Sequence, residues 1–249
     1  MSDFKTLMGG NLIPSEDWDR LGILYEKFLN NKSTEQKIPK KIHQIWLGEM
    51  PPLQKKLIPK IIENHPGWEY KLWTFDNIKD YPLINQELFD KTTNLGSKSD
   101  ILRYEILYNE GGFYMDSDFE MVKSFDSLLN NEFVGGIGHV TAPEVFNGLI
   151  GCTKNNELIK IAIDRLKNSP SDGDIMHLTG PYYFSSILFE YIKTNMDKDI
   201  VVLPTPYFYP FPASERFTTR GREEQLKDYI YSFNSDKTLC IHLWYNSWQ

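Results

Sequence analysis

The chain has few of the features that mark secreted, membrane-spanning or disulfide-stabilised proteins. Its 249 residues include only two cysteines, Cys152 and Cys240, which lie far apart and so exclude a disulfide framework or a paired-cysteine metal site. No stretch approaches the roughly 20 apolar residues of a membrane span, and the N-terminus lacks the basic start and apolar core of a signal peptide. We therefore expect no transmembrane segment and a cytoplasmic location, either free or peripheral at a membrane.

An excess of positive charge is also absent. The formal net charge is −7 at pH 7 and the sequence pI is about 5.3. Nucleic-acid binding depends on clustered lysines and arginines that neutralise phosphates, so we expect no nucleic-acid partner. The hydrophobic content of 41% over 249 residues is enough to bury one sizeable core.

Helical and strand patterns alternate along the chain, without an internal repeat. Apolar spacing predicts helices at residues 15–30, 51–66, 97–112, 155–168 and 180–194, with an interruption of the second at Pro59. Strands are expected at 41–48, 68–75, 113–118, 131–140, 145–153, 199–211 and 236–248. This alternation predicts an α/β fold around a mainly parallel sheet, with ligands beyond the carboxyl ends of the strands.

Two carboxylates, Asp116 and Asp118, follow the expected strand that begins after paired glycines. An Asp-x-Asp pair on extended backbone places both side chains on one face, where they could bind a cation, although solvated turn aspartates are also common. An EF-hand loop is excluded because Met121 occupies the position of its glycine. A haloacid-dehalogenase-type phosphatase is disfavoured because Glu120 stands where that pattern has Thr or Val.

Other candidate residues surround this pair in the sequence. Asp100 and Arg103 lie one helical turn apart and could present a carboxylate and a guanidinium to a polyhydroxylated ligand, or form an intrahelical ion pair. Trp46 ends a strand and faces either a cleft or the core. His242 is followed by a C-terminal segment rich in polar and indole side chains. A single histidine in such a segment either has a structural role or belongs to a functional site.

Five segments together resemble glycosyltransferase family 32: "IPKKIHQIWLG", "SDILRYEILYNEGGFYMDSD", "NGLIGC", "TGPYYF" and "IHLWYNSW". The glucosyltransferase domains of large clostridial toxins look like more distant relatives. The resemblance implies a Rossmann-like GT-A fold over 38–249, as a single domain with an N-terminal helical extension, 1–37. It also implies a retaining hexosyltransferase that uses a nucleotide-diphosphate sugar, with a UDP-sugar favoured over a GDP-sugar, and acts on a hydroxyl of a glycan or other acceptor, as in polysaccharide biosynthesis.

The resemblance assigns roles to particular positions. Residues implied to contact the donor sugar and serve catalysis are Asp100, Arg103, Asp116 and Asn147. Residues implied to bind the nucleotide are Ile45, Trp46, Tyr114, Ser247 and Trp248. The implied metal ligands are Asp118 and His242. The implied cofactor is Mn²⁺, with Mg²⁺ as the alternative.

The chemistry of sugar transfer is consistent with these roles. Breaking the bond between sugar C1 and the diphosphate builds negative charge on the leaving oxygen, which a divalent cation neutralises. An imidazole among oxygen ligands favours Mn²⁺ over Mg²⁺. No carboxylate stands out as a nucleophile, so we favour front-face substitution. A nucleotide-sugar hydrolase and a catalytically silent sugar-binding protein remain as alternatives, and the metal-ligand candidates weigh against the second.

Overall fold

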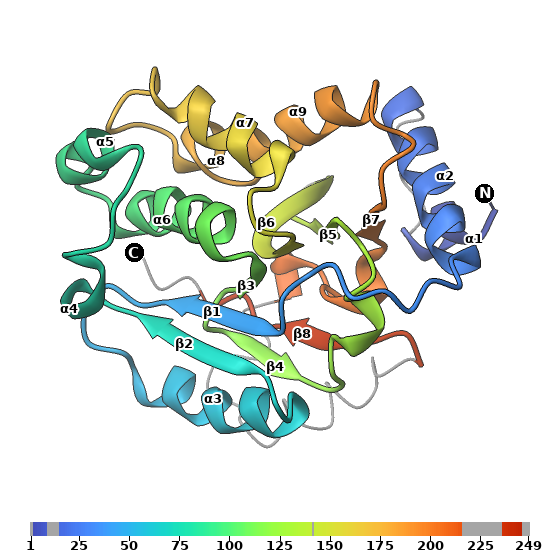
Figure 1. The fold of residues 1–249 in the computed structure, drawn as a ribbon, viewed down its shortest axis with the longest axis horizontal. Helices are drawn as coiled ribbons and strands as arrows, with labels where there is room; N and C mark the ends of the chain where they lie inside the picture. Colours follow the sequence, from blue (N-terminus) through green and yellow to red (C-terminus); the bar gives the residue numbers. More distant parts are fainter. Residues whose placement is uncertain (1, 9–14, 141, 216–235, 246–249) are drawn as a thin grey trace.

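The computed structural model describes residues 2–8, 15–140, 142–215 and 236–245, and its centre is a six-stranded sheet (Figure 1). The strands follow the order β2-β1-β3-β6-β5-β7. Their bounds are Lys41–Ile45 for β1, Glu69–Trp73 for β2, Gly112–Met115 for β3, Phe133–His139 for β5, Pro143–Cys152 for β6 and Ile200–Leu203 for β7. Only β6 runs antiparallel to its neighbours in this sheet. The predicted mainly parallel α/β sheet is therefore confirmed.

Helices cover both faces of the sheet. The longer ones are α2 (Glu16–Asn30), α3 (Pro52–Asn64), α6 (Leu95–Glu110), α7 (Glu157–Leu166) and α9 (Pro181–Ile192). In Figure 1, α6, α7 and α9 lie on one side of the sheet and α3 lies on the other. Shorter helices are α1 (Ser2–Leu7), α4 (Phe75–Ile78), α5 (Gln86–Lys91) and α8 (Ile175–Leu178), with 3₁₀ turns at Asp126–Leu128, Thr205–Tyr207 and Ala213–Glu215. None of the helices described is long and apolar enough to cross a bilayer.

The predicted interruption at Pro59 is wrong, because α3 is continuous from Pro52 to Asn64. A proline inside a helix removes one backbone hydrogen bond, here the one that the carbonyl of Lys55 would accept. Both residues are exposed, so water can satisfy that carbonyl. The cost of the proline is thus low enough for the apolar face, which buries Leu57 and Ile61, to keep the helix intact.

The predicted N-terminal helix is confirmed as α2, and it packs against β7. Ser15 caps it by accepting a hydrogen bond from the backbone N–H of Trp18. Leu21, Leu24 and Tyr25 are fully buried in the same hydrophobic core as the sheet. The N-terminal segment therefore contributes apolar surface to the core of the fold.

Two glycines at the junction of α6 and β3 set the position of the acidic motif. Gly111 ends α6 at a φ of 65° and Gly112 follows at 94°, in the left-handed region that favours glycine. A Cβ on Gly112 would lie 2.7 Å from the carbonyl oxygen of Lys41, so glycine also allows β3 to approach β1. Because β1 and β3 are parallel, Trp46 and Asp116 follow their strands at the same edge of the sheet.

A second, two-stranded sheet brings the C-terminal segment to that edge. It pairs β4 (Phe119–Met121) with β8 (Cys240–His242) in antiparallel register, with Phe119 opposite His242. The backbone N–H of Leu243 donates to the carbonyl oxygen of Asp118 at 2.9 Å. His242 is in this way placed beside a motif that is more than a hundred residues distant in sequence.

Candidate functional site

A cavity of about 570 Å³ lies at the carboxyl end of β3, and both polar and apolar residues line it. The polar and charged residues include Asp100, Arg103, Asp116, Asp118, Asn147 and His242. The apolar and aromatic residues include Val140, Phe146, Ile175, Met176, Pro181, Tyr182 and Trp244. The cavity therefore offers contacts both to a polyhydroxylated group and to an apolar group.

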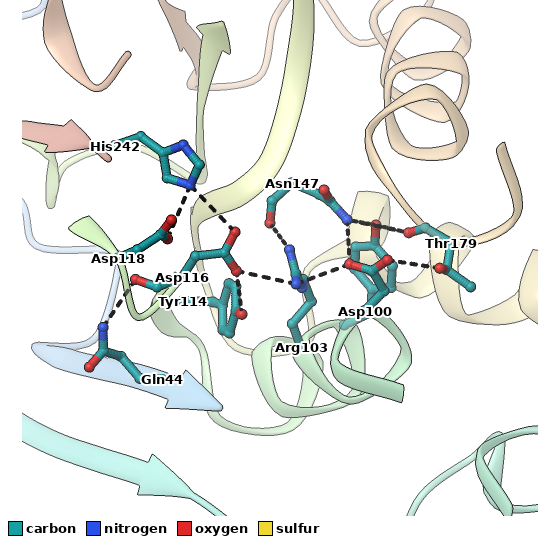
Figure 2. Close-up of polar contacts among 10 residues, drawn as sticks. Gln44, Asp100, Arg103, Tyr114, Asp116, Asp118, Asn147, Thr179 and His242 are labelled. Atoms are coloured by element: carbon teal, nitrogen blue, oxygen red, sulfur yellow. Dashed lines mark hydrogen bonds and ion pairs between the residues drawn. The ribbon is translucent and has the colours of Figure 1, made fainter. Parts of the chain in front are cut away.

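Asp116, Asp118 and His242 form a compact acid–imidazole cluster (Figure 2). The Nε2 atom of His242 lies 3.2 Å from Oδ1 of Asp118 and 3.9 Å from Oδ2 of Asp116. The other oxygen of Asp118 accepts a hydrogen bond from the backbone N–H of Tyr245 at 2.8 Å, which fixes the orientation of the carboxylate. Burial raises the pKa of Asp116, and the nearby Arg103 works against that rise.

The donor atoms of this cluster fit a divalent cation. One ligand atom from each of the three residues lies within 4.8 Å of the others. Two carboxylates this close together repel each other unless a positive charge lies between them. Carboxylate oxygens suit Mg²⁺ and Mn²⁺, and the imidazole nitrogen adds preference for Mn²⁺. Asp116, which the sequence placed among the donor contacts, thus adds an oxygen to the predicted pair of metal ligands.

The predicted pair Asp100 and Arg103 is a buried ion pair that also lines the cavity. The guanidinium NH2 atom of Arg103 lies 3.0 Å from Oδ1 of Asp100 and 3.3 Å from Oδ1 of Asp116, and NH1 donates to the carbonyl oxygen of Asn147 at 2.6 Å. Figure 2 shows Arg103 between the two carboxylates. Burial raises the pKa of Asp100, and the Arg103 guanidinium opposes this.

Asp100 is held by two further donors that come from other elements. The side-chain nitrogen of Asn147, on β6, donates to Oδ1 at 2.9 Å. The hydroxyl of Thr179, between α8 and α9, donates to Oδ2 at 2.8 Å. The side chain of Asp100 is thus oriented by three separate segments, α6, β6 and the α8–α9 junction. Thr179 lies in the "TGPYYF" segment, but its neighbours in sequence did not predict this contact.

Tyr114 and Gln44 lie behind the cluster and position Asp116. Tyr114 is buried, and its hydroxyl donates to Oδ1 of Asp116 at 2.6 Å. The side-chain nitrogen of Gln44 donates to the carbonyl oxygen of Asp116 at 3.1 Å. Tyr114, expected near the nucleotide, lines neither of the two cavities and reaches the site through Asp116.

The predicted nucleotide residues Ile45 and Trp46 line a separate, smaller cavity of about 230 Å³. It lies between the end of β1 and the start of α6, and Leu95 and Ser99 complete its wall. Trp46 is only partly buried, so one part of the indole remains available to a planar ligand. The start of α6 connects the two cavities, because Ser99 lines the smaller and Asp100 the larger.

The structure thus brings the predicted catalytic and metal residues together around one cavity. Ser247 and Trp248, expected to cover the diphosphate, lie outside the described residues. The sequence did not indicate Gln44 or Thr179 as site residues, nor Tyr209, which also lines the larger cavity. These residues reach the site through contacts across the fold, and no local pattern marks them.

The sequence is similar to those of known glycosyltransferases. Residues 51–134 match the family model described as the glycosyltransferase sugar-binding region containing the DXD motif. An uncharacterized glycosyltransferase of Acanthamoeba polyphaga mimivirus is 27% identical over 70% of this chain and 73% of its own length. The inositol phosphoceramide mannosyltransferase 2 of Schizosaccharomyces pombe is 32% identical over 81% of this chain, and the match covers 64% of the mannosyltransferase.

A solved structure gives a matching result for the fold. The PaToxG glycosyltransferase superimposes over 88% of this chain and 85% of its own, with a TM-score of 0.52 and 19% sequence identity. This likeness confirms the predicted GT-A class. The family model and the sequence matches separately confirm the predicted resemblance to the glycosyltransferases that carry the DXD motif.

Proposed function

We propose that this chain is a metal-dependent, retaining glycosyltransferase that moves a hexose from a nucleotide-diphosphate sugar to an acceptor hydroxyl. The observation that carries the proposal is the acid–imidazole cluster of Asp116, Asp118 and His242 next to the Asp100–Arg103 pair. The first group suits a cation with a diphosphate, and the second suits sugar hydroxyls. Their sharing of one cavity supports a single bound donor that spans both.

The donor would extend from the smaller cavity into the larger one. Trp46 and the backbone of Ile45 would bind the base, and Asp118 and His242, with Asp116, would hold Mn²⁺ or Mg²⁺ beside the diphosphate. A UDP-sugar is proposed ahead of a GDP-sugar, as the resemblance implies. When bound, the cation neutralises charge on the leaving diphosphate.

The protein's own groups would orient the sugar for attack. Asp100 accepts hydrogen bonds in the described structure and could accept them from sugar hydroxyls, while Arg103 and Asn147 fix its position. We propose front-face substitution, in which the acceptor hydroxyl attacks C1 on the side from which the diphosphate leaves. The leaving phosphate then takes the hydroxyl proton. The described cavity supports this route because its carboxylates are engaged with Arg103 and the cluster, which leaves none poised as a nucleophile.

The apolar part of the cavity lining is proposed as the acceptor subsite. Met176 and Tyr182, at the α8–α9 junction, belong to this lining. An acceptor that carries an alkyl or aryl group beside its reactive hydroxyl would bury that group here and displace water. Water itself would be the nucleophile in a nucleotide-sugar hydrolase, so nucleotide release with and without acceptor separates the two functions.

The test is turnover of a nucleotide-sugar panel by the wild type and the Asp118→Asn variant. UDP-glucose, UDP-galactose, UDP-N-acetylglucosamine and GDP-mannose would be supplied with Mn²⁺, Mg²⁺ or EDTA, and released nucleoside diphosphate measured. We expect metal-dependent turnover by the wild type and a loss of roughly 10³-fold in Asp118→Asn, because a charged metal ligand is removed. The asparagine oxygen can still accept from the Tyr245 N–H, so the unliganded melting temperature should change little.

Glu120→Gln provides the matched control. Glu120 is the next carboxylate along the motif, but it pairs with Lys60 of α3 and does not line the cavity. Its amide variant should keep wild-type turnover. Near-wild-type turnover by Asp118→Asn in Mn²⁺ would refute the metal role, and the absence of metal-dependent turnover in the wild type would refute the proposed function.

A further inference from the structure

The segment after β7 directs an unpaired hydroxyl group into the main cavity. Tyr209 lines this cavity and is only 2% exposed, yet its hydroxyl has no hydrogen-bond partner among the described residues. A buried polar group without a hydrogen-bond partner destabilises the fold, and nearly all buried polar groups in folded proteins are paired. An unpaired hydroxyl in the wall of a ligand cavity therefore points to a partner supplied by the ligand.

The ring of Tyr209 is held in place on several sides. Its centroid lies 5.4 Å from that of His242, 5.6 Å from Phe119, 5.3 Å from Phe146 and 5.7 Å from Trp244. Rotation of a tyrosine ring about its own axis does not move the hydroxyl oxygen. The packing therefore fixes where that oxygen lies, and it cannot turn away to find a partner elsewhere.

Gly148 shows what the hydroxyl of Tyr209 faces. A Cβ built on Gly148 would lie 2.6 Å from Oδ2 of Asp116 and 3.3 Å from the Tyr209 hydroxyl oxygen. The two oxygens therefore flank the same small space, which glycine leaves open. The other oxygen of Asp116 is already engaged by Tyr114 and Arg103. Gly148 directly follows Asn147, whose side chain donates to Asp100, so this space is bordered by Asp116 of the acid–imidazole cluster and by the strand that holds Asp100.

We propose that the Tyr209 hydroxyl hydrogen-bonds to the transferred sugar and is a residue that selects and orients it. A phenol can donate and accept at once, so it can pair with a sugar hydroxyl that also donates to Oδ2 of Asp116. The diphosphate is assigned elsewhere, to the side where Nε2 of His242 faces Asp118. This inference rests on the proposed function and adds one polar contact to those already proposed for the sugar.

The test is Tyr209→Phe, which removes one oxygen atom and keeps the ring packing. Without ligand, its melting temperature should equal or exceed that of the wild type, because an unpaired buried hydroxyl is lost. With Mn²⁺, the shift produced by UDP-glucose, UDP-N-acetylglucosamine or GDP-mannose should be smaller than in the wild type. The shift produced by UDP or GDP alone should be unchanged. For the donor that is turned over, kcat/KM should fall about tenfold, as expected for the loss of one hydrogen bond.

Tyr25→Phe is the matched control. The hydroxyl of Tyr25 lies 3.0 Å from that of Tyr207 in the core, and Tyr25 lines neither cavity. This variant should melt at a lower temperature and keep the wild-type kcat/KM. An unchanged response of Tyr209→Phe to nucleotide sugars, in an enzyme that is otherwise active, would overturn the inference alone. An equal loss of the response to UDP or GDP would assign the hydroxyl to the diphosphate and also overturn it. A wild type stabilised by neither sugars nor nucleotides would refute the proposed function as well.

Discussion

Gln44 connects two strands of the sheet to the backbone of the acidic motif. It lies on β1, is fully buried, and donates from its side-chain nitrogen to the carbonyl oxygen of Asp116. Its side-chain oxygen accepts from the hydroxyl of Tyr70, on β2, at 2.8 Å. Because the amide nitrogen must donate and the amide oxygen must accept, these two contacts fix the orientation of the Gln44 amide. The position of Asp116 thus depends on a residue that never reaches the cavity.

We expect Gln44→Met to weaken the site as well as the fold. Methionine has a similar length but leaves the Asp116 carbonyl and the Tyr70 hydroxyl without partners, at a cost of about 1–3 kcal/mol. Because Asp116 would be less well positioned, the Mn²⁺ concentration for half-maximal turnover should rise about tenfold. Titration of turnover with Mn²⁺, alongside urea unfolding, measures both effects.

Tyr70→Phe separates the two contacts of Gln44. It removes only the outer hydrogen bond and keeps the donor to Asp116, so its Mn²⁺ requirement should stay close to that of the wild type. If Gln44→Met loses stability but binds Mn²⁺ as tightly as the wild type, Gln44 supports the fold alone.

At the scale of elements, the α8–α9 junction holds a polar residue of the cavity and also contributes to its apolar lining. Thr179 holds Asp100, while Met176 and Tyr182, on either side of it, belong to the apolar lining. A Cβ on Gly180 would approach the carbonyl oxygen of Ile175 to 2.8 Å, so the turn between the helices is tight. A change in the apolar lining can therefore be tested apart from the contact to Asp100.

We expect Met176→Asn to affect the acceptor and not the donor. Losing most of an apolar side-chain contact costs about 1–2 kcal/mol, which raises the KM for an alkyl or aryl acceptor roughly tenfold. Hydrolysis of the nucleotide sugar without acceptor should be unchanged. Ile62→Asn, at an apolar residue of α3 that is 51% exposed, is the control and should change neither. Equal KM values for an octyl and a methyl acceptor in the wild type would contradict an apolar subsite.

Elements with strong local signals could be predicted from the sequence, and those held by distant contacts could not. The apolar residues of α6 and the glycines at its end predicted the helix that carries Asp100 and Arg103, although the helix begins at Leu95, after a cap at Asn94, and not at Ser97. By contrast, β4 and β8 have three residues each and exist because they pair with each other. The motif residues were therefore found by sequence, whereas Gln44, Thr179 and Tyr209 required the fold.

At the scale of the whole molecule, buried titratable groups make stability depend on pH. Burial lowers the pKa of His43 to about 4, and it also lowers the pKa values of His65 and His139. A histidine that resists protonation in the folded state destabilises the fold as pH falls below its unfolded pKa, near 6.5. Carboxyl groups whose pKa burial raises act in the opposite direction, since the folded state then binds protons more readily: Asp100, Glu105, Asp116 and Glu144.

A comparison with His43→Gln isolates one of these contributions. His43 is 1% exposed, accepts from the indole N–H of Trp73 on one ring nitrogen, and contacts the carbonyl oxygen of Gly111 with the other at 2.9 Å. Glutamine can still donate to that carbonyl but does not titrate. We compare the unfolding free energy of the wild type with that of the variant, as the difference wild type minus variant. This difference should fall by about 3 kcal/mol between pH 7.5 and pH 4, because the imidazole is protonated at a higher pH in the unfolded chain than in the folded protein. Below the folded pKa of about 4 the difference should level off. Urea unfolding in EDTA at a series of pH values measures it, and a difference that is constant from pH 7.5 to pH 4 would show that the fold does not keep His43 neutral.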